Sequence, residues 1–235
     1  DSAAMKKLEL LGLTNQTTSI FPLVAMILAV LLQIAVLFYN SMQYHEAAKR
    51  TEYVLFYVTV MSLSVLLMKF FQLFQTEQAA YIPLFYPAAF APLVLNVFLN
   101  RRSGIIAALF QTVTALFIYY DSIGTNFLTA ILMSYLFSGL LATVLKRQRV
   151  SEQWVSAMMW VIIFPLLMDI VLIIYQGMSF SDGTTWLMLV CGFMGTLLSY
   201  LLTMGLHPYI ELMVNDDSVI VLNELSNPNH PLLKQ

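Results

Sequence analysis

Two charged residues lie in apolar parts of this chain, where ionisable side chains could do chemistry. Lys69 and Asp169 each lie inside a long apolar stretch, and Gln72 follows Lys69 by about one helical turn on the same face. A charge in hydrocarbon is costly and usually faces a partner or a cavity. The three residues are therefore a candidate intramembrane polar site for a ligand or a proton. In the structural alternative, Lys69 reaches the outer interface and Asp169 caps a helix or pairs with a neighbour.

Composition identifies the solvent around these residues. Hydrophobic residues make up 60% of the 235 residues and charged residues only 10%, with a mean hydropathy of +0.79. So little polar surface cannot cover a soluble globule of this length, so we expect an integral membrane protein with the lipid bilayer as partner. The net charge of -2 offers no basic surface, and no nucleic-acid partner is expected.

Seven apolar stretches follow one another, each close to the roughly 20 residues that cross a bilayer as a helix. Continuous apolar runs without period-2 alternation do not suit a membrane barrel. We therefore predict an all-α polytopic membrane protein with a seven-helix transmembrane bundle over residues 19–206. The expected spans are residues 20–39, 53–74, 81–99, 104–120, 126–145, 154–175 and 186–206.

Basic residues are sorted between alternate loops. Three loops hold Lys49, Arg50, Arg101, Arg102, Lys146, Arg147 and Arg149, and the loops between them hold no Lys or Arg. By the positive-inside rule, the basic loops and the C-terminus are cytosolic and the N-terminus is outside. Lys6 and Lys7 favour the opposite placement of the N-terminus, but the loops outnumber them. Residues 1–18 are then an extracellular lead from an upstream domain.

This orientation places the candidate site. The second and sixth spans both run outward, so Lys69 and Asp169 lie at matching depths, roughly 22–24 Å from the inner surface at about 1.5 Å per residue. An ion pair between them is geometrically allowed.

Prolines and small residues predict irregular or close-packed spans. Pro83, Pro87 and Pro92 should kink the third span or delay its start, and Pro165 should free a carbonyl in the sixth. A hinge, a site or an ordinary membrane kink would each account for them. Other polar residues have structural interpretations. The small residues of the seventh span, Gly192, Gly195 and Ser199, permit close helix contact. Three amides inside other spans most simply join helices by hydrogen bonds: Gln33, Asn96 and Gln111.

Several chemistries find no support in these residues. His45, His207 and His230 lie in loops or at the inner boundary, and the lone Cys191 completes no metal shell. No glycine-rich phosphate loop is present. We expect no catalytic residue, cofactor or metal site in this segment.

Residues 207–235 form the expected cytosolic connector. His207 and Pro208 follow the last span, and Glu211 lies one turn after His207. Farther on, Pro228 and Pro231 would end a short helix in a stiff turn. These five residues are the candidates for coupling the bundle to an output domain.

The connector also carries a family resemblance. Residues 205–211 (Gly-Leu-His-Pro-Tyr-Ile-Glu) and 225–233 (Leu-Ser-Asn-Pro-Asn-His-Pro-Leu-Leu) resemble the junction before the HD domain in bacterial seven-transmembrane HD-family proteins. Residues 87–92 and the Arg101–Arg102 loop are similar as well, so the resemblance covers essentially the whole chain.

The resemblance implies a three-part protein of the bacterial cytoplasmic membrane. An extracellular domain would precede this module, and a cytosolic HD domain with divalent metal ions, iron or manganese, would follow and hydrolyse cyclic di-AMP to pApA. A homodimer is compatible with that plan. The module would then relay a signal or only anchor the enzyme. The alternative from another class is a small-solute transporter or channel, based on the prolines and on Lys69 with Asp169.

Overall fold

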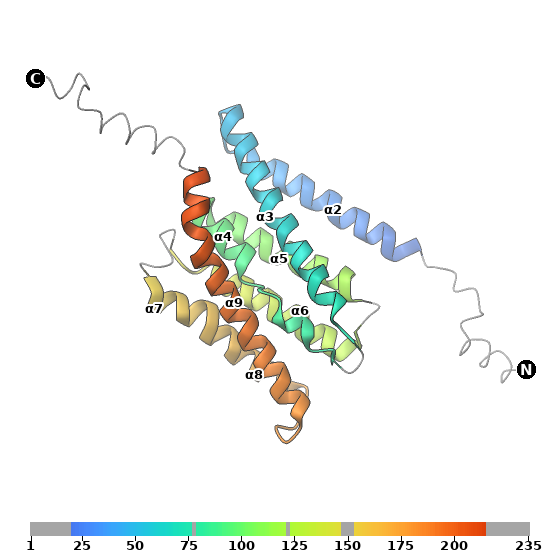
Figure 1. The fold of residues 1–235 in the computed structure, drawn as a ribbon. Helices are drawn as coiled ribbons and strands as arrows, with labels where there is room; N and C mark the ends of the chain where they lie inside the picture. Colours follow the sequence, from blue (N-terminus) through green and yellow to red (C-terminus); the bar gives the residue numbers. More distant parts are fainter. Residues whose placement is uncertain (1–19, 77–78, 121–122, 147–152, 215–235) are drawn as a thin grey trace, which may run out of the picture. The chain divides into compact units, whose positions relative to one another are not determined.

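The structure is a computed structural model that describes residues 20–76, 79–120, 123–146 and 153–214 (Figure 1). All regular secondary structure in these ranges is helical, which confirms the all-α prediction. The contacts divide the chain into residues 1–39 and residues 40–235. Most of the first helix, α2 (Ile20–Ser41), belongs to the first unit, and the rest of the description concerns the second.

The described residues of the second unit form nine helical elements that follow one another along the chain. Several join end to end into longer helical segments. They are α3 (Ala47–Leu73), η2 (Ile82–Phe85), α4 (Phe90–Phe98), α5 (Arg101–Tyr119), α6 (Thr125–Ala142), α7 (Trp154–Ala157), η4 (Met158–Ile163), α8 (Phe164–Tyr175) and α9 (Gly183–Val214).

In the part of the chain that the structure describes, five helices are long and apolar enough to cross a membrane. They span Pro22–Ser41, Ala47–Leu73, Arg101–Tyr119, Trp154–Tyr175 and Gly183–Ile210. The third and fifth predicted spans coincide with shorter apolar helical segments, Ile82–Phe98 and Phe127–Ala142. The seven-span count and the orientation of the termini therefore stay predictions.

The third predicted span is a broken helix, as its prolines indicate. One 3-10 turn, η2, contains Pro83 and ends at an extended Tyr86, and α4 starts only at Phe90. Pro87 lies in the gap, where its missing N–H removes the donor that would continue η2. The α4 helix packs against α3, α5, α6 and α9, so the broken segment lies inside the bundle.

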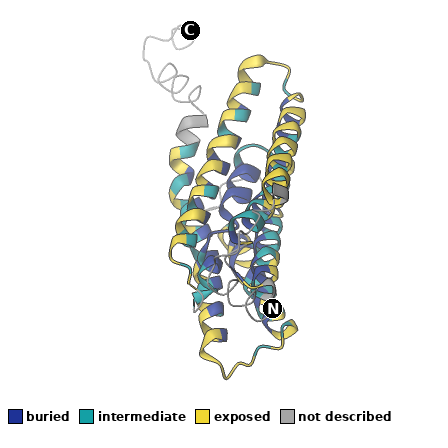
Figure 2. Cartoon of the chain, turned by 90° about the vertical axis from the view of Figure 1, so that its right-hand side faces the viewer, coloured by how far each residue is buried: buried dark blue, intermediate teal, exposed yellow. Residues whose placement is uncertain are grey.

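Burial follows the same arrangement. Every α4 residue from Phe90 to Val97 is buried, whereas the long helices expose large apolar side chains on their outer faces (Figure 2). Such an apolar outer surface is what a lipid environment requires. The innermost helix, α4, is therefore part of the segment that the prolines break.

The sixth predicted span is continuous but not uniformly α-helical. Residues 158–163 form a π-helical stretch, η4, directly before Pro165. The Phe164 amide bonds to the Met159 carbonyl, a wider turn than an α-helix makes. The π turn therefore accommodates the break in hydrogen bonding that Pro165 imposes.

Candidate functional site

Asp169 is placed by α8 in a buried position facing two other helices. Its side chain is 6% exposed. The Ser134 side chain of α6 forms a hydrogen bond with the carboxyl group. The other neighbour is Gly192 of α9, where an added Cβ atom would lie only 2.5 Å from Asp169 Oδ2. The small residue at position 192 is what allows α9 to pass the carboxyl group.

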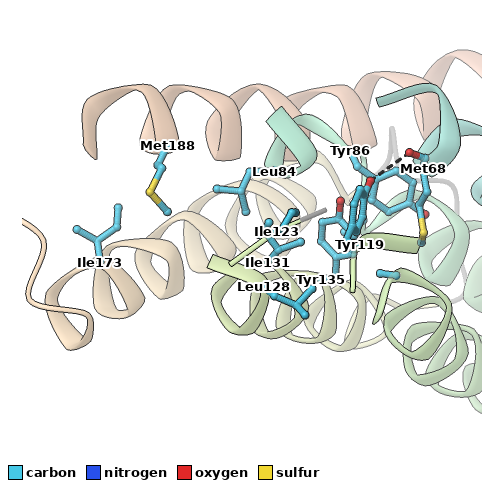
Figure 3. Close-up of a cluster of buried hydrophobic side chains, with 12 residues drawn as sticks. Met68, Leu84, Tyr86, Tyr119, Ile123, Leu128, Ile131, Tyr135, Ile173 and Met188 are labelled. Atoms are coloured by element: carbon cyan, nitrogen blue, oxygen red, sulfur yellow. Dashed lines mark hydrogen bonds between the residues drawn. The ribbon is translucent and has the colours of Figure 1, made fainter. Parts of the chain in front are cut away.

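One carboxyl oxygen of Asp169 is unsatisfied. Oδ2 is buried and has no hydrogen-bond partner in the structure. A small cavity of about 10 Å³ lies beside it, and its other lining residues are apolar: Leu84, Ala130, Leu172, Ile173 and Met188. Figure 3 shows Ile173 of α8 and Met188 of α9 facing one another, with Leu84 nearby. This volume is close to the minimum that admits a single water molecule.

Lys69 and Gln72 form a separate pair near the end of α3. Lys69 is exposed, and its Nζ donates to Gln72 Oε1 at 2.9 Å. Gln72 Nε2 in turn donates to the Ile118 carbonyl of α5 at 2.6 Å. The expected one-turn relation between the two residues is present, and it links α3 to α5.

The structure does not join the two halves of the candidate site. Lys69 points to the outer surface of the bundle, whereas Asp169 is buried between α6, α8 and α9. Among the residues described, the ion pair found is Lys49 with Glu46, at 3.0 Å. The depths expected from the sequence thus did not imply contact, because Lys69 is exposed on α3, whereas Asp169 is buried where α8 packs against α6 and α9. Ser134 and Gly192 complete the surroundings of Asp169, and neither had been assigned to it from the sequence.

A second buried polar network surrounds the broken segment, and Gln111 is the one member to which the sequence had assigned a hydrogen-bonding role. Tyr135 donates from α6 to the Pro83 carbonyl, and Gln111 Nε2 donates from α5 to the Ala88 carbonyl at 2.7 Å. Tyr86 within the gap bonds to the Ser64 hydroxyl of α3 and donates to Gln111 Oε1 at 3.4 Å. Side chains from three helices therefore satisfy the carbonyls and hydroxyl of the irregular segment, as apolar surroundings demand.

The interhelical role predicted for Gln111 is confirmed, because its Nε2 also donates from α5 to the Tyr135 carbonyl of α6 at 3.5 Å. Asn96 Nδ2 of α4 donates at 2.9 Å to the carbonyl of Leu145, which follows the end of α6, so this bond joins a helix to a loop. Gln33 lies in α2, and its role stays a prediction.

At the predicted output end, α9 continues through Pro208 to Val214 without a break. His207 is buried, and its ring lies 4.9 Å from the ring of Phe98 at the end of α4. Pro208 is exposed on the other side of the helix. The Glu211 side chain and residues Pro228 and Pro231 lie outside the described part, so their coupling role stays a prediction.

Comparison with known families accounts for this architecture. The family described as "7TM receptor with intracellular HD hydrolase" matches residues 20–218. This chain belongs to that family. The match runs from α2 past the end of α9, so the described residues are the transmembrane region of a 7TM-HD protein.

Two curated relatives cover the whole chain. The cyclic-di-AMP phosphodiesterase PgpH of Listeria monocytogenes is 26% identical over 238 residues, and the protein of the same name from Bacillus subtilis is 24% identical over 237 residues. The chain spans about a third of their length, 32% and 33%. No solved structure matches it.

The 7TM-HD family implies a metal-dependent hydrolase, and the residues of this segment do not fit such a metal. Within the described ranges, no three His, Cys, Asp or Glu side chains gather in one place. The buried carboxyl group of Asp169 is the best candidate ligand, but its neighbours are the Ser134 hydroxyl and Gly192. These groups offer too few oxygen ligands for a divalent ion.

Proposed function

We propose that this chain is the membrane module of a cyclic di-AMP phosphodiesterase in the bacterial cytoplasmic membrane. Family membership and the names of both relatives support this role. The hydrolysis of cyclic di-AMP to pApA would take place in a cytosolic HD domain with iron or manganese ions. An extracellular domain would precede the bundle.

The observation that favours relay over simple anchoring is the continuity of α9. The helix packs against η2 and α4 in the bundle and extends unbroken to Val214. Gly195 lies against the Leu84 carbonyl, so the broken segment and α9 are in direct contact. Because a helix transmits displacement along its axis without slack, a shift of the broken segment would move the end of α9. This movement would displace the hydrolase domain attached beyond α9.

A wedge in this contact tests the relay. In the full-length protein, Gly195→Ala would place a methyl group against the Leu84 carbonyl and displace α9. We expect the rate of cyclic di-AMP hydrolysis in membranes to change several-fold. Gly205→Ala is the matched control, because it lies on the same helix with nothing within 4 Å of the added Cβ. Its rate should equal that of the wild type.

A flexible linker provides the second arm of this experiment. A long Gly-Ser insertion after the connector should make the rates of Gly195→Ala and wild type equal, because the displaced helix then pulls on a slack chain. A folded Gly195→Ala protein with the wild-type rate would reduce the module to an anchor. A difference between the two rates that survives the insertion would also contradict transmission through α9.

The transporter alternative draws on the broken helix, because transporters bind substrates at such breaks. Here the carbonyls of Pro83 and Ala88 are bonded to Tyr135 and Gln111 side chains. The break is thus part of the packed core, and the membrane-module role is the better supported one.

A further inference from the structure

Asp169 is the most deeply buried acidic or basic side chain in the described part of the chain. Every other Asp, Glu, Lys and Arg side chain that the structure describes is exposed or half-buried, and the Glu211 side chain lies outside the described part. Its carboxyl group has a hydrogen bond from Ser134 on one side and an unpartnered Oδ2 on the other. A carboxylate buried in this way needs a counter-charge or a proton.

No counter-charge faces it from the elements packed against α8. These are α6, η4 and α9, and α6 and η4 contain no Lys, Arg, His, Asp or Glu. On α9, the groups that could be charged are His207 and Glu211. Both lie at least 15 residues beyond Gly192, roughly 22 Å along the helix. The remaining titratable groups on these elements are neutral side chains: Tyr135, Cys191, Tyr200 and Tyr209.

The cavity limits what else could neutralise the carboxyl group. It holds about 10 Å³, and all of its lining residues except Asp169 are apolar. A sodium, magnesium or organic cation needs more room or several oxygen ligands. A proton needs neither extra room nor several oxygen ligands. A single water molecule, which the cavity can just hold, can deliver it.

We propose that Asp169 is a proton-binding site of the bundle. Oδ2 takes a proton from a hydronium ion and releases water, and the neutral acid packs against Gly192. When α8 and α9 separate, the carboxylic acid gives its proton to an entering water molecule, which leaves a carboxylate and a hydronium ion. The π-helical η4 and Pro165, just before Asp169, supply the irregular turn at which α8 can bend. The site stands independently of the hydrolase, and only its influence on hydrolysis depends on the proposed function.

Infrared spectroscopy of the full-length protein in lipid nanodiscs tests the site directly. The wild type should show the C=O stretch of a protonated carboxyl group, shifted in D2O and lost at alkaline pH. Asp169→Asn should remove this band while keeping the side-chain shape. Asp182→Asn, a substitution at an exposed position just before α9, should keep it. Absence of the band from the wild type at every pH, or its persistence in Asp169→Asn, would overturn the proposal.

Two further measurements cover the remaining outcomes. If Asp169→Asn fails to fold, Ser134→Ala should shift the band, because it removes the hydrogen bond to this carboxyl group; an unshifted band would refute the assignment. Adding sodium at constant pH should leave the band unchanged, and its loss would identify a cation site instead. A band that depends on Asp169, together with hydrolysis that no bundle variant alters, would support the proton site and contradict the proposed function.

Discussion

At the scale of single residues, buried polar side chains in this bundle have two different roles. Gln111 and Tyr135 satisfy backbone carbonyls that the broken third segment leaves without helical partners. Asp169 is surrounded by groups that leave one of its oxygens unsatisfied. A satisfied polar group contributes to stability, whereas an unsatisfied one calls for a partner, such as a water molecule, a ligand or a proton. The two roles call for different measurements.

Gln111 offers the clearest stability prediction. Gln111→Leu keeps the approximate volume but removes the donor to the Ala88 carbonyl and the acceptor for the Tyr86 hydroxyl. The expected loss is about 1–2 kcal/mol in the free energy of unfolding, since interhelical hydrogen bonds in membranes are worth about that much at most. Reversible unfolding in mixed detergent micelles measures it.

Thr59→Val is the control for this prediction. Thr59 is exposed and bonds only to the Leu55 carbonyl of its own helix, so its replacement should change stability by less than about 0.5 kcal/mol. Equal losses in the two variants would show that the Gln111 network adds nothing to the core.

At the scale of elements, close contact between helices depends on glycines at particular crossings. Gly104 of α5 is one of them: an added Cβ would lie 2.7 Å from the Pro92 carbonyl oxygen and 3.0 Å from Asn96 Cβ. Both neighbours belong to α4, which is buried on all sides and cannot move aside easily. The broken segment is therefore held between glycine-lined surfaces of α5 and α9.

Gly104→Ala should destabilise the bundle by about 1–3 kcal/mol, the usual cost of overpacking a core. Gly183→Ala, at the first residue of α9 with no atom near the added Cβ, should be close to neutral. Thermal unfolding of both variants in the same detergent gives the comparison. A neutral Gly104→Ala would mean that α4 and α5 are less tightly packed than these distances indicate.

At the scale of the whole molecule, the orientation predicted from the basic loops is open to direct test. Single cysteines at Arg101 and Asp182 in a Cys191→Ser background place one label at each predicted face, since both positions are exposed. A membrane-impermeant maleimide should label Asp182→Cys in intact cells and Arg101→Cys only after permeabilisation. The reverse pattern would invert the bundle and place the end of α9 outside.

The chain's apolar composition and the length of its apolar runs determined the membrane class and the helical fold. The predicted spans agree with the helices to within a few residues at most ends, and the prolines predicted the break that η2 and α4 show. These features are local: hydrophobic length, missing N–H groups and small side chains act within one segment of sequence. The resemblance at residues 205–211 and 225–233 indicated the family to which the chain belongs.

Only the tertiary structure decided which polar residues meet. Lys69 and Asp169 were expected at matching depths, but Lys69 is exposed on α3, whereas Asp169 is buried on α8 beside Gly192. Which helices are neighbours, and which face of each is buried, is set by tertiary packing, which a single sequence does not specify. The same packing brought Ser134 to Asp169 and Tyr135 to the Pro83 carbonyl. Segment identity is thus a local property of this chain, whereas its candidate site is a property of how the segments pack.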